Sequence, residues 1–192
     1  MEPKMMTWLV VGTETIFFLA LIMGFIYFAY YPGFDPKSVG LLEPVQTGAF
    51  TALLLASSLT YWRVEVNFKQ GKQKPLRIWL IITLALGATF LAGQLMEYKH
   101  LFDQQLVISQ GTFATGFFTL TGFHGLHVLI GLICLLVVLC LAFLGDFENS
   151  DSSLIQAVGI YWHFVDVVWI IVFALVYILP QFINLHGHVS TP

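Results

Sequence analysis

A histidine and an aspartate within one apolar stretch are the first residues whose types and spacing could do chemistry. His163 and Asp166, in YWHFVDVVW, are three residues apart and therefore lie on one face of a helix. Such a pair could relay protons, bind a metal ion or form a hydrogen-bonded contact, either within its own helix or with another helix. One His and one Asp are too few ligands for zinc. The ligand count therefore favours the structural contact, with the proton relay as the alternative.

A second candidate is Glu14, in the apolar run WLVVGTETIFFLALIMGF. At the rise of a helix it lies roughly 10 Å into a membrane from Trp8. An ionisable group at that depth is a functional candidate by default. Because little water can stabilise a charge there, we expect a neutral acid bonded to another helix, with His163 or Tyr161 as the partner. A proton-carrying role is the alternative.

Two further histidines, His124 and His127, stand in TGFHGLHVLIG and raise the question of haem ligation. Residues three apart on one helix cannot bind both faces of a porphyrin, so a second helix would have to supply a ligand. We therefore predict no haem or metal on this chain.

Gln94, Glu97 and Tyr98, in AGQLMEYKH, come at the end of another apolar run. Glu97 is expected at the membrane interface, where Tyr98 would suit the aromatic belt. No nucleotide-binding loop or catalytic motif is present, so we predict no catalytic, cofactor-binding or metal-binding residue. The predicted set of buried polar residues, structural or proton-linked, is Glu14, His163, Asp166, His124, His127, Gln94, Glu97 and Tyr98.

The composition indicates the setting in which these residues act. The chain has 192 residues, of which 58% are hydrophobic and only 10% are charged, whereas a soluble domain carries roughly 25% charged residues. This predicts an integral membrane protein. A formal net charge of −3 is too small to indicate nucleic-acid binding.

The apolar runs predict an all-α fold, a single membrane domain over residues 1–192 built as a transmembrane five-helix bundle. Each run is long enough to cross about 30 Å of hydrocarbon. The expected helices are about 5–30, 44–67, 76–100, 112–144 and 154–179. The helix over 112–144 opens with small and polar residues on opposite faces, which predicts close neighbours on both sides and a central place in the bundle.

The distribution of Lys and Arg predicts the orientation of the bundle. Five of the eight basic residues cluster around the loop between the second and third helices, and basic loops stay in the cytoplasm. The N-terminus is then inside and the C-terminus outside. These five residues are Arg63, Lys69, Lys72, Lys74 and Arg77.

Several of these stretches together resemble the conserved blocks of subunit III of the haem-copper terminal oxidases, of the cytochrome c oxidase type. The two most specific are TGFHGLHVLIG (121–131) and YWHFVDVVWIIVF (161–173). GTETIFFLALIMGF (12–25), GAFTALLLASSLTYW (48–62) and GQLMEYKHL (93–101) are also similar to family blocks. The resemblance covers about residues 8–183.

The resemblance implies a non-catalytic subunit that packs on the catalytic subunit I and other oxidase subunits. Haem and copper would lie in the partner, and this chain would support proton uptake during oxygen reduction in aerobic respiration. Phospholipid is an expected ligand, and Glu14 takes the position of the family's buried membrane glutamate. The mitochondrial form has seven helices, so a five-helix chain points to the inner membrane of a bacterium.

Three other functions stay open at this stage. The first is a stand-alone proton or ion transporter, motivated by Glu14, Glu97, His163 and Asp166, although no inverted repeat is visible. The second is a dihaem membrane cytochrome, which the spacing of His124 and His127 opposes. The third is subunit III of a quinol oxidase or of a nitric-oxide-reductase-associated complex, which share this fold. The electron donor is open.

Overall fold

The computed structural model describes residues 3–29, 36–108, 111–145 and 153–180. Within these ranges the regular secondary structure is entirely helical, as predicted. The long helices are α1 (Pro3–Phe28), α3 (Pro44–Lys69), α4 (Gln73–Asp103), α5 (Thr112–Leu144) and α6 (Ser153–Phe173). The expected end of the first helix at Tyr30 and the C-terminal tail from residue 181 lie outside the described residues.

Two short elements have no counterpart in the sequence-based expectation. A single-turn helix, α2 (Pro36–Gly40), precedes α3, and a π-helical turn, η3 (Ala174–Ile178), continues α6. A five-residue helix has too few positions to show a hydrophobic period. A π-helical turn has the composition of the α-helix it interrupts.

Helix ends follow local backbone chemistry. Pro44 occupies the first turn of α3, where its missing N–H costs nothing. Gly71 (φ 67°) lies in the turn between α3 and α4, in the left-handed region that favours glycine. Gly145 (φ 82°) ends α5 in the left-handed conformation, with its N–H donated to the Leu141 carbonyl.

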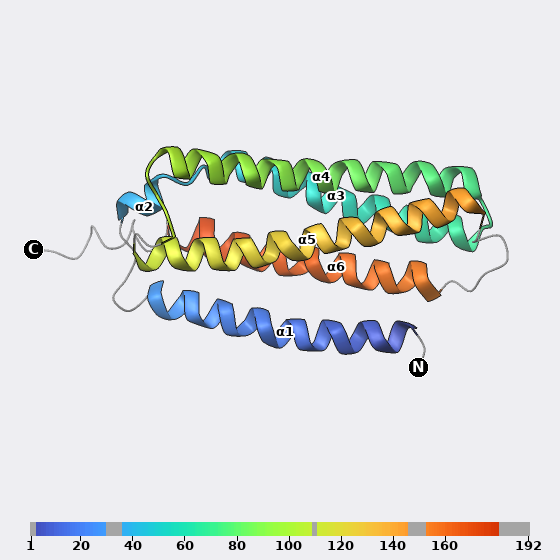
Figure 1. Cartoon of the computed structure of the whole chain (residues 1–192), viewed down its shortest axis with the longest axis horizontal. Coiled ribbons are helices and arrows are strands. Elements are labelled where there is room, and N and C mark those ends of the chain that lie inside the picture. The colour runs from blue at the N-terminus through green and yellow to red at the C-terminus, as the bar shows by residue number, and fades with distance from the viewer. Residues whose placement is uncertain (1–2, 30–35, 109–110, 146–152, 181–192) are drawn as a thin grey trace, which may run out of the picture.

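The five long helices lie side by side, with α5 and α6 in the middle (Figure 1). The α3–α4 pair covers one side of them and α1 covers the other. The helices α1, α4, α6 and α2 all contact α5. The chain direction places the start of α3 and the end of α4 at one end of the bundle, called here the Pro44 end (Figure 1).

Glycine lets the central helices approach closely around Trp162, which is fully buried. A Cβ on Gly131 of α5 would lie 2.8 Å from the Trp162 ring, and a Cβ on Gly87 of α4 would also lie 2.8 Å from it. The indole therefore occupies a slot with glycine on two neighbouring helices. Small residues at such crossings are the general means of packing helices in lipid.

Four described helical segments are long and apolar enough to cross a membrane: Met5–Phe28, Gln73–Asp103, Thr112–Leu144 and Ser153–Ile178. The helix α3 is not among them, although it has 26 residues and runs alongside α4. It carries Arg63 and Glu65 in its second half and buries Thr47, Thr51 and Ser57 against its neighbours. The predicted five-helix count therefore stays a prediction, and so does the orientation.

Alanine at Gly131 should destabilise the bundle, because its Cβ would lie 2.8 Å from the ring of Trp162, which is fully buried. Overpacking of this kind costs about 1–3 kcal/mol, and we expect a lower temperature of thermal unfolding for the detergent-purified protein. Gly24→Ala is the matched control, since a Cβ there meets nothing within 4 Å. Equal unfolding temperatures for the two variants would show that the glycine slot does not limit packing.

Candidate functional site

The predicted polar residues form four separate interhelical contacts along the bundle. The first joins α1 to α5, where Glu14 Oε2 lies 3.0 Å from His127 Nε2. His127 is 11% exposed and Glu14 is 30% exposed, so the carboxyl group reaches the outer surface of the isolated chain. Phe17, Phe18 and Phe123 pack around this pair.

The expected partner of Glu14 was wrong. We predicted His163 or Tyr161, but the structure brings Glu14 to His127. The Tyr161 hydroxyl instead donates to the His127 carbonyl at 3.2 Å, so it lies one step behind the pair. The depth of Glu14 along α1 is compatible with several neighbours, and only the packing of α1 against both α5 and α6 selects one.

Hydrogen bonding at the other ring nitrogen limits the protonation states of the Glu14–His127 pair. His127 Nδ1 lies 2.7 Å from the Phe123 carbonyl, which can only accept, so Nδ1 carries a proton. Nε2 then either accepts a hydrogen bond from a neutral Glu14 or donates one to an ionised Glu14. In both cases one proton lies between the two side chains.

The second contact joins α3 to α6 and uses the predicted His163 and Asp166. The two side chains meet at Ser58, whose Oγ is 2.7 Å from His163 Nδ1 and donates to Asp166 Oδ2 at 2.5 Å. Since Ser58 has a single proton, which goes to Asp166, it accepts from His163 Nδ1–H. The geometry is that of a hydrogen-bonded contact between helices, one of the two forms of structural contact that the ligand count left open.

Near the Pro44 end, Glu97 joins α3, α4 and η3. Thr47 Oγ1 donates to Glu97 Oε1 at 3.1 Å, and the Tyr177 hydroxyl donates to Oε2 at 2.7 Å. Both carboxyl oxygens of Glu97 are thus bonded to other helices.

Gln94 and Tyr98, one turn apart on α4, bind α5. Gln94 Nε2 donates to the Thr121 carbonyl at 2.7 Å. The Tyr98 hydroxyl lies 2.7 Å from Thr121 Oγ1 and donates to it, because Thr121 gives its own proton to the Phe117 carbonyl.

His124 is fully buried and surrounded by aromatic rings. Its ring centroid lies 4.7 Å from Trp169, 6.2 Å from Phe90 and 6.4 Å from Phe18. Neither ring nitrogen has a hydrogen-bond partner among the described residues. His124 packs in this aromatic core, whereas His127 bonds to Glu14 on α1, so the two histidines belong to different environments.

Within the described ranges, no group of three or more His, Cys, Asp and Glu side chains is placed to hold a metal ion. Each of the four contacts joins helices through one or two hydrogen bonds per side chain, the arrangement expected of buried polar groups in lipid.

The sequence-based prediction did not identify the polar face of α3, whose hydroxyl groups accept hydrogen bonds from two tryptophans of α6. Trp162 Nε1 donates to Ser57 Oγ at 3.1 Å, and Trp169 Nε1 donates to Thr51 Oγ1 at 2.9 Å. The signal was available: small hydroxyl residues recur on 44–67 at helical spacing, and the two tryptophans are seven residues apart. Tyr177 gave no such signal, because its direction depends on the π-helical turn.

Comparison with known proteins gives consistent matches over most of the chain. The family model described as "Cytochrome c oxidase subunit III" matches residues 4–181. Cytochrome c oxidase subunit 3 of Synechocystis sp. is 38% identical over 86% of this chain and 71% of that protein. Subunit 3 of the Alkalihalophilus pseudofirmus cytochrome c oxidase is 34% identical over 90% and 84%. Subunit 3 of the Pseudomonas aeruginosa cytochrome bo(3) ubiquinol oxidase is 30% identical over 90% and 82%.

Substitutions at Glu14 should separate a bonding role from a proton-carrying one. Gln keeps the shape and can donate to His127 Nε2, so Glu14→Gln should weaken the helix contact by ~1 kcal/mol or less. Glu14→Ala leaves Nε2 unpaired and should cost roughly 1–3 kcal/mol. We therefore expect the Ala variant to leave its complex at a lower detergent concentration, while the Gln variant remains assembled.

The control for both variants is Thr13→Ala, because the exposed Thr13 hydroxyl donates to the Val10 carbonyl of its own helix. A Gln variant that stays assembled but takes up protons more slowly during turnover would contradict the structural role. That result would assign the shared proton of the Glu14–His127 pair a part in proton transfer.

Proposed function

The chain belongs to the cytochrome c oxidase subunit III family, and on this basis we propose that it is the non-catalytic third subunit of a respiratory haem-copper oxidase in a bacterial inner membrane. It would pack on catalytic subunit I and stabilise it during oxygen reduction. The observation that carries the proposal is that residues of the two most specific family motifs form contacts between helices. His127, His163 and Asp166 all bond to other helices of this chain.

Haem and copper would then belong to the partner subunit, and electrons would pass there. We place the complex among the cytochrome c oxidases, because the relatives with that name are 38% and 34% identical to the chain. A quinol oxidase is the second candidate, supported by the 30% identical relative from Pseudomonas aeruginosa. Phospholipid is a proposed ligand in either case.

The Glu14–His127 pair supports a link to proton uptake. It shares one proton between two helices, and Glu14 is partly exposed on the surface of the chain. We propose that this face of α1 and α5 lies against a partner or an annular lipid and not against bulk water. A transporter acting alone has less support, because the other polar pairs bond within the bundle.

Affinity purification of the tagged chain from its native membrane, followed by an optical spectrum, tests this assignment. We expect co-purification with a larger subunit and absorption bands of haem and copper. His127→Ala should leave those bands unchanged in shape while more of the chain is lost in detergent. A colourless chain purified alone would favour the transporter, and loss of one haem band with the subunits still associated would place a ligand on this chain.

The proposed topology has five crossings, with the N-terminus inside and the Pro44 end outside. Its basis is the clustering of Arg63, Lys69, Lys72, Lys74 and Arg77 around the α3–α4 turn. In a background with Cys134 and Cys140 changed to Ala, cysteine at Lys72 or Asp103 should react with an impermeant maleimide from opposite sides of sealed membranes. Both positions are exposed. Labelling of both positions from the same side would show that the chain does not cross the membrane between them.

A further inference from the structure

A line of polar side chains runs along the boundary between α3 and α6, from the end of the bundle that holds the α3–α4 turn toward its middle. Glu65 comes first, four residues before the end of α3. Its carboxyl group lies against the backbone of α6, since a Cβ on Gly159 would lie 2.5 Å from Glu65 Oε1. His163 follows one turn after Gly159, and Asp166 comes three residues later. From Gly159 to Asp166 the line covers ~10 Å along the helix axis.

This line becomes more buried along its length. Glu65 and His163 are half-buried, whereas Asp166 is 2% exposed. Glu65 is close enough to act electrostatically on the His163 ring. Ser58 joins that ring to Asp166 through contacts of 2.7 and 2.5 Å. An outer carboxyl group, an imidazole, a hydroxyl group and a buried carboxyl group therefore follow one another in space.

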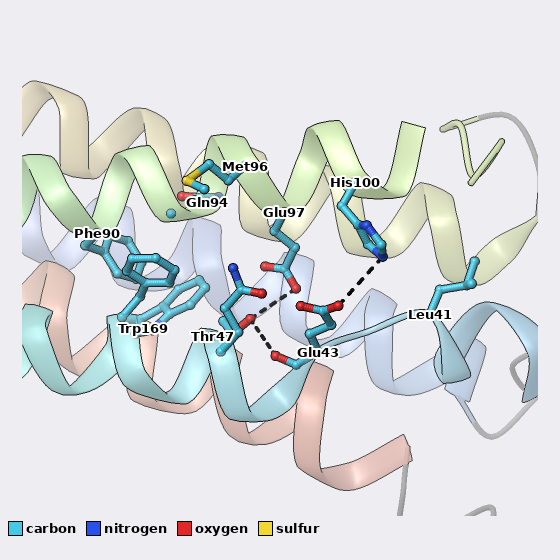
Figure 2. A pocket seen from close by; sticks show the side chains of 12 residues that line it. Leu41, Glu43, Thr47, Phe90, Gln94, Met96, Glu97, His100 and Trp169 are labelled. Carbon is cyan, nitrogen blue, oxygen red and sulfur yellow. Dashed lines mark hydrogen bonds and ion pairs between the residues drawn. The ribbon is translucent and has the colours of Figure 1, made fainter. Parts of the chain in front are cut away.

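The line ends at the carboxyl group of Asp166. Among the described residues, Asp166 Oδ1 is the one carboxyl oxygen that is buried without a hydrogen-bond partner. Glu97 differs, because its two oxygens accept bonds from Thr47 and Tyr177 and it lines a cavity of about 300 Å³ between α3 and α4 (Figure 2). Within the described part of the chain, no hydrogen bond continues the line beyond Oδ1. A proton that reaches Asp166 therefore leaves by the route on which it arrived.

The contacts at Ser58 allow two proton arrangements with the same distances between heavy atoms. In the first, Asp166 is ionised, His163 Nδ1–H donates to Ser58 Oγ, and Ser58 donates to Asp166 Oδ2. In the second, Asp166 is neutral and both bonds are reversed, so Nε2 carries the ring proton. One proton added at Nε2 converts the first arrangement into the second, because the Nδ1 proton passes to Ser58 Oγ as the Ser58 proton passes to Oδ2. The net result is one proton gained by Asp166.

Other ionisable groups around α6 are bonded elsewhere. Tyr61 of α3 packs against the His163 ring, with 6.1 Å between the centroids, and donates its hydroxyl proton to the Ile155 carbonyl. The helices α1 and α5 also pack on α6, but their Glu14 and His127 bond to each other. The half-buried Glu65 is therefore the group placed to bring a proton to His163.

We propose that this line is a proton relay, in which Glu65 and His163 load the buried Asp166 from the surface near the α3–α4 turn. Because the relay has a dead end, Asp166 stores one proton and does not pass it across the membrane. The relay is separate from the pair that joins α1 to α5. It depends neither on the oxidase assignment nor on the electron donor of the complex.

Infrared spectroscopy of the intact complex in lipid nanodiscs tests the relay through deuterium exchange. A protonated carboxyl group has a C=O stretching band that shifts when deuterium replaces the proton. We expect such a band at mildly acidic pH, and its absence in Asp166→Asn assigns it. After mixing with deuterated water, the band of Glu65→Gln should shift about tenfold more slowly, because the negative charge that attracts the proton is lost. His163→Asn should slow the shift by ~100-fold, since an amide can bond to Ser58 but cannot take up a proton at one atom and release it at another.

The matched control is Glu43→Gln, which removes the same charge from an exposed position at the other end of α3. Its exchange rate should equal that of the unaltered complex. Loosened packing would admit water and speed the exchange, so slower exchange distinguishes the relay from a purely structural role. The proposal is overturned by the absence of an Asp166 band at every pH, by an unchanged exchange rate in Glu65→Gln, or by equal slowing in Glu43→Gln.

Discussion

The need to bond every polar group inside lipid is the constraint on which the rest of this structure depends. A donor or acceptor left unpaired in hydrocarbon costs free energy, and water is not present to replace the partner. The chain meets this constraint at most of its buried polar groups with contacts between helices at successive levels: Glu97 with Thr47 and Tyr177, Ser58 with His163 and Asp166, and Glu14 with His127. Among the described residues, both ring nitrogens of His124, Gln94 Oε1 and Asp166 Oδ1 are buried without a hydrogen-bond partner. Each contact fixes the rotation of a helix, because it forms only when the correct face is turned inward.

Packing around the two buried tryptophans of α6 acts together with these bonds. Trp162 and Trp169 present their rings to the core and donate their N–H groups to hydroxyl oxygens of α3. Gly131 and Gly87 provide the space for Trp162. The helix α6 therefore sets the positions of α3, α4 and α5. The two tryptophan bonds explain why α3 packs in the bundle although its hydropathy is low for a membrane span.

The predicted polar residues differ in how deeply they are buried. Asp166 is bonded through Ser58 and His124 is enclosed by aromatic rings, and both are buried, whereas His163, which also bonds to Ser58, is half-buried. Glu14 is half-buried as well, and it shares one proton with His127. This combination of a shared proton and surface exposure gives Glu14 the clearest link to the proposed function.

Long apolar runs and specific motifs allowed the sequence alone to determine the helical class, the membrane character and the family. These properties depend on composition and on the fixed rise of a helix, both of which are local. The tertiary structure decided which polar residues meet, because the rise gives a depth but does not give the neighbour at that depth. Glu14 was matched to His163 or Tyr161 by depth and pairs with His127, since α1 turns that face toward α5. The direction of Tyr177 and the cavity beside Glu97 were equally inaccessible, because a π-helical turn and the space between two helices exist only once the helices have packed.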